Sequence, residues 1–254
     1  MSIKKSIINI SRNFAKKYGY EIVKIQNKKK IDLKAEAHPA YMKEAAEAGM
    51  DINDYQEIRL GFVESLPLLN EIVFPVIDKL KEPLIIELGP GSGRWSRHII
   101  RKVKSNGGGG IILVDHSEWI VDFLRGYFKN VSDNKLSLTF SKCDGFKLPE
   151  NAKDLSADLI FASNTFVALG IYFYYTYSHD FFRVLKSGGY CIFDYIDLNT
   201  EGGWNFLKQK TKEGLNYYAY YTFEAVDKVF RDAGFEYISR HNYGKSTYLI
   251  YRKP

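Results

Sequence analysis

The chain has 254 residues, of which 45% are hydrophobic and 26% are charged. This composition excludes a disordered, collagen-like or coiled-coil protein and predicts one α/β domain with an accessory segment. Two cysteines, Cys143 and Cys191, allow at most one bridge, which excludes a disulfide framework and favours a cytoplasmic location. The longest nearly apolar run, residues 166–175, is about half as long as a membrane-spanning helix.

The positive charge is concentrated at the N-terminus. Residues 1–34 carry ten basic and two acidic side chains, a net charge of +8, whereas the rest of the chain has 26 basic and 28 acidic side chains. We therefore expect no nucleic-acid partner for the body of the protein. Within this basic arm, Ile3, Ile7, Ile10 and Phe14 recur at helical spacing. They predict an amphipathic helix that covers the domain or a partner subunit of a homo-oligomer, or else makes a peripheral contact with an anionic membrane.

The next segment reads as helical. Helix-forming residues fill positions 37–48, and apolar positions recur every three or four residues from 55 to 80, with expected interruptions near Pro67 and Pro75. We interpret residues 1–80 as a basic arm with a helical cap and residues 81–254 as the main domain.

From residue 84, short apolar runs alternate with helical patterns. Strands are predicted at 84–88, 111–115, 136–141, 157–162 and 190–196, and helices at 92–104, 117–129 and in an aromatic stretch that ends near 185. A flexible loop is expected at 107–110. A helix at 222–233, a strand from 235, a turn at 244–245 and a last strand at 247–252 predict a closing antiparallel hairpin. The alternation predicts a Rossmann-like, doubly wound, mostly parallel seven-stranded α/β sheet with helices on both faces.

A glycine-rich turn joins the first strand to the first helix of this pattern. It contains Glu87, Gly89, Gly91 and Gly93. Glycines let the backbone turn sharply and approach a ligand closely, while the following helix offers free N–H groups and positive potential. A dinucleotide-binding fingerprint would need a glycine at position 94, which is Arg94.

Acidic residues follow the next two strands. Asp115 ends the second strand, where a carboxylate can accept both ribose hydroxyls of a nucleoside or, alternatively, cap the next helix. Asp144 and Gly145 follow the third strand. With the glycine turn and the closing hairpin, this order resembles class I S-adenosylmethionine-dependent methyltransferases over about residues 80–252.

The resemblance implies S-adenosylmethionine as the cofactor and assigns its contacts. The glycine turn would hold the methionine and ribose portions, and Asp115 the ribose. Asp144, with Gly145, would contact adenine, and His116 would touch adenine or ribose. Ser163 and Asn164 would approach the methionine amino group and the reacting centre.

A narrower resemblance concerns residues 89–96, Gly-Pro-Gly-Ser-Gly-Arg-Trp-Ser, which are similar to a variant common among methyltransferases of bacterial surface-polysaccharide (capsule or O-antigen) clusters. Many of these relatives carry an Asp after the fourth strand and a His four residues later. Here those positions are Asn164 and Ala168, so the general base is left open. The candidates are His179, in the aromatic helix, and Asp194 and Asp197, near the end of the fifth strand, of which the position at the strand's carboxyl end favours Asp197.

Aromatic and basic side chains suggest the acceptor site. Tyrosines cluster at 172–177 and 217–221 and, with Trp204, are candidates to line an acceptor site between sheet and cap, the alternative being ordinary helix packing. Arg59 and Arg94 are the nearest expected cations and suit an anionic acceptor such as a nucleotide-linked sugar or a phosphorylated metabolite, unless they form surface salt bridges. No Cys-x-x-Cys or His-x-x-x-His spacing occurs, and no required metal is expected.

These features predict a methyltransferase for a small molecule of bacterial surface-glycan synthesis. The expected reaction is O-methylation of a sugar hydroxyl, a phosphate or a phosphoramidate. A hydroxyl needs a general base to take its proton, whereas a phosphate or phosphoramidate oxygen is already anionic and needs none. N-methylation of an amino sugar or another small molecule is the alternative. An RNA methyltransferase is less favoured, since Asn164 is not followed by the Pro-Pro-Tyr or Pro-Pro-Phe typical of base methylators.

Overall fold

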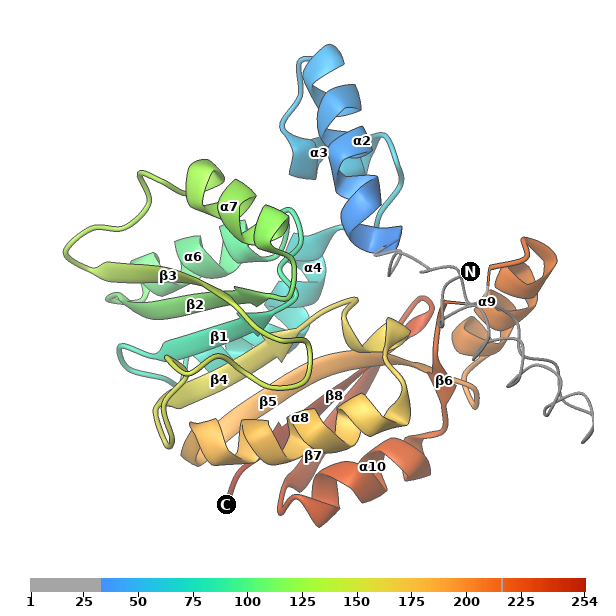
Figure 1. The fold of residues 1–254 in the computed structure, drawn as a ribbon. Helices are drawn as coiled ribbons and strands as arrows, with labels where there is room; N and C mark the ends of the chain where they lie inside the picture. Colours follow the sequence, from blue (N-terminus) through green and yellow to red (C-terminus); the bar gives the residue numbers. More distant parts are fainter. Residues whose placement is uncertain (1–32, 216) are drawn as a thin grey trace, which may run out of the picture.

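The computed structural model describes residues 33–215 and 217–254, which form an eight-stranded sheet with helices on both faces (Figure 1). The strand order is β3 (Leu136–Lys142), β2 (Gly109–Asp115), β1 (Leu84–Leu88), β4 (Ala157–Ala162), β5 (Leu185–Asp197), β8 (Ser246–Arg252) and β7 (Glu236–Tyr243). Strands β1 to β5 are parallel, and β8 runs antiparallel between β5 and β7. This confirms the predicted Rossmann-like sheet with its closing hairpin. The short strand β6 (Tyr220–Tyr221), which pairs with β5, was not predicted.

Two inner strands, β1 and β4, begin and end where predicted, whereas β5 begins at Leu185, before its predicted start at residue 190. β1 and β4 cover the predicted residues, because strands buried on both faces are mostly apolar; each contains one acidic residue, Glu87 in β1 and Asp158 in β4. The expected loop at 107–110 is wrong in its second half, since β2 already begins at Gly109. A Cβ on Gly109 would lie 2.5 Å from the carbonyl oxygen of Pro83, so glycine is needed there for close strand approach rather than for flexibility.

One face of the sheet is covered by α6 (Ser96–Ser105), α7 (Glu118–Tyr127) and a helical run of three consecutive pieces. The pieces are α4 (Ser65–Leu68), the wide π turn η1 (Leu69–Val73) and α5 (Phe74–Ile77). The run does not break at Pro67 or Pro75, where interruptions were expected. Pro67 stands in the first turn, where no N–H is needed, and Pro75 is the second residue of α5, after the wide turn that ends at Val73. The break falls instead at residues 59–64.

The other face is covered by α8 (Ile171–Val184) and α10 (Phe223–Asp232) (Figure 1). Many aromatic residues of this part of the chain are core residues. Phe193 of β5 stacks on Phe230 of α10 with ring centroids 4.4 Å apart, and Tyr174 of α8 is fully buried beside Phe166. The aromatic helix predicted to end near residue 185 is therefore confirmed, with several of its rings used for packing.

The remaining helices lie outside these two layers. α2 (Leu33–Glu47) and α3 (Ile52–Ile58) lie beyond the sheet near α7, and α9 (Glu201–Lys212), which was not predicted, follows β5 (Figure 1). The amphipathic helix proposed for the basic arm lies outside the described residues. Among the helices of residues 33–254 that the structure describes, none has the length and apolar character to cross a membrane.

Candidate active site

The carboxyl ends of the parallel strands meet at one edge of the sheet. Because β8 runs antiparallel to β5, with Thr247 opposite Tyr195, the turn between β7 and β8 lies at the same edge. The residues predicted to bind the cofactor stand at or directly after the ends of β1, β2, β3 and β4. The fold therefore brings them to the edge where open α/β sheets bind ligands.

The glycine turn after β1 has a backbone that other residues do not readily adopt. Gly89, Gly91 and Gly93 have φ angles of +72°, +55° and +81°. A Cβ on Gly89 would lie 2.1 Å from Oγ1 of Thr165, and one on Gly93 would lie 2.8 Å from the ring of Phe128. The turn is thus a closely packed cradle of bare backbone in front of α6.

Glu87 lies beneath this cradle, with 1% of its surface exposed. Burial raises the pKa of Glu87 to about 8, and the nearby Ser96 hydroxyl opposes this shift, so the carboxyl holds its proton at neutral pH. Its Oε2 atom is buried without a hydrogen-bond partner among the described residues. A buried polar atom without a partner is costly, so Glu87 fits a site that a polar ligand completes.

Asp115 ends β2 beside the cradle and is buried, with 6% exposed. Its Oδ1 accepts a hydrogen bond from the backbone N–H of Ser117 (2.9 Å) and lies 3.2 Å from Nδ1 of His116. Asp115 thus shapes the turn before α7 (Glu118–Tyr127), whose N-cap is Ser117, so it does not itself cap the helix as in the alternative interpretation; it stands where a ribose is expected. The His116 side chain is 58% exposed at the same edge.

Asp144 and Gly145 form the neighbouring loop after β3. Oδ1 of Asp144 accepts hydrogen bonds from the backbone N–H groups of Phe146 (2.8 Å) and Lys147 (3.0 Å), and these bonds lower the pKa of Asp144. A Cβ on Gly145 would lie 3.9 Å from Cβ of His116, so the β2 and β3 loops are side by side. One oxygen of Asp144 is thus used to shape its own loop.

The segment after β4 reaches the cradle from the other side. Ser163 exchanges a 2.7 Å hydrogen bond with Tyr248 of β8, and Thr165 Oγ1 donates to the carbonyl oxygen of Leu88 (3.1 Å). Between them, Asn164 has a φ of +56°, and its backbone N–H donates to Oδ1 of Asp194 (2.7 Å). A non-glycine residue in this region is held by its surroundings, which favours a functional position.

Lys245 joins this segment from the β7–β8 turn, and the sequence did not predict it. Its Nζ donates to Oδ1 of Asn164 (3.0 Å) and lies 5.1 Å and 5.5 Å from the ring centroids of Phe206 and Tyr218. Burial lowers the pKa of Lys245, and the nearby Asp194 carboxylate opposes this shift. A lysine, an amide and two aromatic rings therefore meet at the edge where the acceptor is expected.

Asp197, predicted as a base, lies at the expected strand end but is fully buried and hydrogen bonded. Oδ2 accepts from the hydroxyl of Tyr195 (2.6 Å), and Oδ1 accepts from the backbone N–H of Asn199 (2.9 Å). Burial, followed by this bond, raises the pKa of the Tyr195 hydroxyl. The carboxylate is thus engaged in shaping the turn before α9.

The other predicted base, His179, lies elsewhere. It is on α8, partly exposed, packs edge to face against Tyr175 and faces Asp232, the last residue of α10, at 3.7 Å. α10 leads into the first residues of β7, and β7 runs in the same direction as β5. The His179–Asp232 pair therefore lies at the edge of the sheet opposite to the carboxyl ends of the parallel strands. The sequence pattern predicted that His179 lies on a helix. It did not show which edge of the sheet this part of the helix lies nearest to.

The predicted acceptor residues are dispersed. Arg59 is exposed at the end of α3, and Trp204, on α9, is 49% exposed. Arg94 is buried, donates to the carbonyl oxygen of Val63, pairs with Glu57 at 3.6 Å and lies 4.5 Å from the ring centroid of Trp95. Burial lowers the pKa of Arg94, and Glu57 opposes this shift. Arg94 is therefore part of an internal network rather than an open cation.

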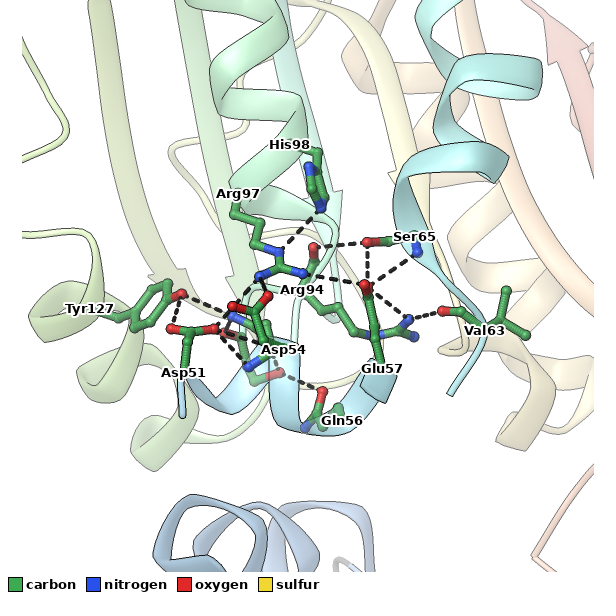
Figure 2. Close-up of polar contacts among 12 residues, drawn as sticks. Asp51, Asp54, Gln56, Glu57, Val63, Ser65, Arg94, Arg97, His98 and Tyr127 are labelled. Atoms are coloured by element: carbon green, nitrogen blue, oxygen red, sulfur yellow. Dashed lines mark hydrogen bonds and ion pairs between the residues drawn. The ribbon is translucent and has the colours of Figure 1, made fainter. Parts of the chain in front are cut away.

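Figure 2 shows how that network holds α3 against the glycine turn. Ser92 donates to Oδ1 of Asn53 (2.7 Å), and Nδ2 of Asn53 donates to the Ser92 carbonyl oxygen (3.2 Å) and to the Tyr127 hydroxyl (3.1 Å). Tyr127 in turn donates to Asp51 (2.7 Å), and burial, followed by this bond, raises the pKa of Tyr127 to about 12. Arg97 of α6 pairs with three acidic residues around α3, namely Asp51, Asp54 and Glu57.

A second contact fixes α9 to the hairpin that carries Lys245. A Cβ on Gly202 would lie 1.9 Å from the carbonyl oxygen of Gly244, and one on Gly203 would lie 2.0 Å from the carbonyl oxygen of Asp197. Two adjacent glycines thus let the first turn of α9 touch both the β7–β8 turn and the end of β5.

Comparisons with known proteins agree with this geometry. The family model described as a methyltransferase domain matches residues 81–245. An S-adenosylmethionine-dependent methyltransferase from Clostridium acetobutylicum is 14% identical and superposes with a TM-score of 0.62 over 84% of this chain and 99% of that one. One from Thermotoga maritima is 19% identical, with a TM-score of 0.56 over 87% of this chain and 100% of that one.

A Haloferax volcanii protein solved in complex with the Trm112 methyltransferase activator is 17% identical, with a TM-score of 0.58 over 84% of this chain and 97% of that one. None of the curated proteins matches the chain. At these identities the structures establish a shared fold, and the family model establishes the family. The chain belongs to the methyltransferase-domain family of class I methyltransferases, and S-adenosylmethionine is its methyl donor.

Proposed function

We propose that the cradle formed by Glu87, the three glycines and Asp115 holds S-adenosylmethionine, and that the enzyme methylates a small acceptor beside Asn164. The observation that carries the proposal is the unpartnered buried oxygen of Glu87 under a glycine turn where a Cβ on Gly89 or Gly93 would clash. When bound, S-adenosylmethionine supplies an electrophilic methyl group on a sulfonium. The residues of the chain then have to orient the acceptor, and orientation alone is worth roughly 7–11 kcal/mol of barrier.

We propose the remaining cofactor contacts as expected from the sequence. Asp115 accepts the ribose hydroxyls, with His116 beside it, and Asp144 with Gly145 borders the adenine. The adjacency of the β2 and β3 loops supports this arrangement, as does the position of Ser163 and Asn164 next to Thr165, which touches the cradle.

The favoured acceptor is one that needs no strong base. Asp197 is fully buried with both oxygens hydrogen bonded, and His179 lies at the opposite edge of the sheet. We therefore favour O-methylation of a phosphate or phosphoramidate oxygen, which is already anionic, over that of a sugar hydroxyl. N-methylation of an amine is the second candidate, because an uncharged amine likewise needs no general base before it attacks.

The proposed role in surface-glycan synthesis rests on the Gly-Pro-Gly-Ser-Gly-Arg-Trp-Ser sequence of residues 89–96. The proposed cytoplasmic location is supported by Cys143 and Cys191, both of which are free and buried. The Haloferax volcanii structure is a complex with an activator protein, and binding of such a protein would be a further property to test in this chain.

The test has two parts. Calorimetry with S-adenosylmethionine should show binding that weakens when Asp115 is replaced by alanine. A screen of nucleotide-linked sugars, phosphorylated metabolites and amino sugars should then yield S-adenosylhomocysteine with one acceptor class. Wild-type protein that does not bind S-adenosylmethionine would refute the proposal, and salt-sensitive methylation of RNA in place of any small molecule would refute the acceptor class.

A further inference from the structure

We propose that Lys245 anchors a negatively charged group of the acceptor, a phosphate or a carboxylate, next to the position of methyl transfer. This inference rests on the proposed function, since it concerns the acceptor side of the same site. It replaces Arg59 and Arg94 as the acceptor-binding cations with a residue from the β7–β8 turn.

The first argument is position. Thr165 Oγ1 touches the cradle through the carbonyl oxygen of Leu88, and the preceding residue, Asn164, accepts a hydrogen bond from Lys245 Nζ at 3.0 Å. One side chain thus separates the ammonium from the segment that borders the glycine turn. An acceptor group bound by Lys245 would lie within reach of that turn.

The second argument is the charge balance around the ammonium. Three other lysines also lie over phenylalanine rings, and each has stronger partners than Lys245. Lys102, over Phe74, pairs with Asp78, and Lys210, over Phe206, pairs with Glu213 at 2.6 Å. Lys253, over Phe182, donates to two backbone carbonyl oxygens. Among the described residues, none places a carboxylate oxygen within 4 Å of Lys245 Nζ.

The nearest negative charge is Asp194, whose oxygens accept hydrogen bonds from the Asn164 backbone (2.7 Å) and from Ser246 (2.7 Å). A partly buried ammonium with one amide partner retains donors for an anion. Binding an anion there would offset the cost of burying the charge.

The third argument is the apolar surround. Phe206 and Tyr218 pack edge to face with centroids 4.9 Å apart, and both rings lie beside Nζ. Aromatic faces favour the charged ammonium over the neutral amine and strengthen its interaction with an anion by excluding water. In the same aromatic segment, the hydroxyl of Tyr220 is buried and has no hydrogen-bond partner among the described residues.

The experiment uses sodium pyrophosphate as the probe. It is titrated calorimetrically into the full chain saturated with S-adenosylhomocysteine, which keeps the anion away from the glycine turn. Lys245→Gln removes the charge, Lys245→Met is a second neutral variant, and Lys245→Arg keeps the charge. Lys102→Met is the matched control, because it also removes an ammonium from a phenylalanine ring, at the end of α6 away from the site. Sodium chloride at equal ionic strength corrects for general screening.

We expect Lys245→Gln and Lys245→Met to weaken pyrophosphate binding by about tenfold or more, the usual effect of losing a charged hydrogen bond. Lys245→Arg should stay within about threefold of the wild type, and Lys102→Met should not change it. Absent binding to the wild type, or equal binding by wild type and the two neutral variants, would overturn the inference. The preceding S-adenosylhomocysteine titration reports separately on the proposed function; if that ligand fails to bind, the same comparison on the ligand-free chain still decides the role of Lys245.

Discussion

Replacing Glu87 by glutamine should make the ligand-free protein more stable in alkaline solution and change the pH dependence of its stability. Glu87 is buried, and its pKa is raised from 4.5 to about 8 by burial. The native state therefore holds a proton that the unfolded state loses above pH 4.5. The stabilisation that comes from this bound proton is complete below pH 4.5 and is lost as the pH rises towards 8.

The magnitude follows from the two pKa values. Each pH unit in this window corresponds to about 1.4 kcal/mol, so the wild type loses about 5 kcal/mol in total and about 3.5 kcal/mol between pH 5 and pH 8 relative to the variant. Glutamine has nearly the same shape and no proton to lose, so its curve lacks this contribution. Other titrating groups are common to both proteins and cancel in the difference.

The assay is urea unfolding between pH 5 and pH 8.5, followed by tryptophan fluorescence. Trp95 is a suitable reporter, because it is buried and directly precedes α6. The free energy of unfolding of Glu87→Gln minus that of the wild type should rise steadily with pH. Curves that stay parallel within about 1 kcal/mol would refute the reasoning, because Glu87 would then be ionised in the folded protein.

Three further predictions concern the same edge and its opposite. Gly89→Ala should destabilise the protein and abolish S-adenosylmethionine binding, because its Cβ meets Thr165. Gly145→Ala has a similarly positive φ but only an ordinary van der Waals contact at 3.9 Å, so it should cost only about 1 kcal/mol in thermal unfolding; equal effects would contradict the steric argument. Asp115→Asn should weaken S-adenosylmethionine binding in calorimetry by about tenfold or more, and unchanged affinity would remove Asp115 from the site. His179→Ala should leave the methyl-transfer rate within about twofold, and a large loss would place a base where the fold puts none.

The sheet was predictable because the local sequence marks the ends of several inner strands. Leu84–Leu88 and Ala157–Ala162 are mostly apolar, as strands buried on both faces are, and they are followed directly by a glycine and a serine. The short strand Tyr220–Tyr221 and helix α9 were not found, since neither has a distinct apolar period and both depend on contacts with β5 and its hairpin.

The cofactor side was easier to predict than the acceptor side. Its residues follow consecutive parallel strands, so chain order alone brings them to one edge. Lys245 resembled an ordinary turn lysine, and its contact with Asn164, 81 residues earlier, follows only from the antiparallel register of β8 on β5. The burial of Arg94 could not be predicted from the sequence. Its partners Glu57 and Val63 belong to a segment whose packing against the glycine turn is visible only in the structure.

Gly202 and Gly203 approach the hairpin and the end of β5 closely. This contact restricts which residues of α9 can be substituted, in engineering or in evolution. Any Cβ at either position would force the first turn of α9 away from backbone atoms, and Phe206 would move with it. Substitutions that change the substrate range should therefore disturb the fold less in the later turns of α9 than in its first turn. Libraries that aim at a new acceptor should randomise the later residues of that helix and leave the glycine pair untouched.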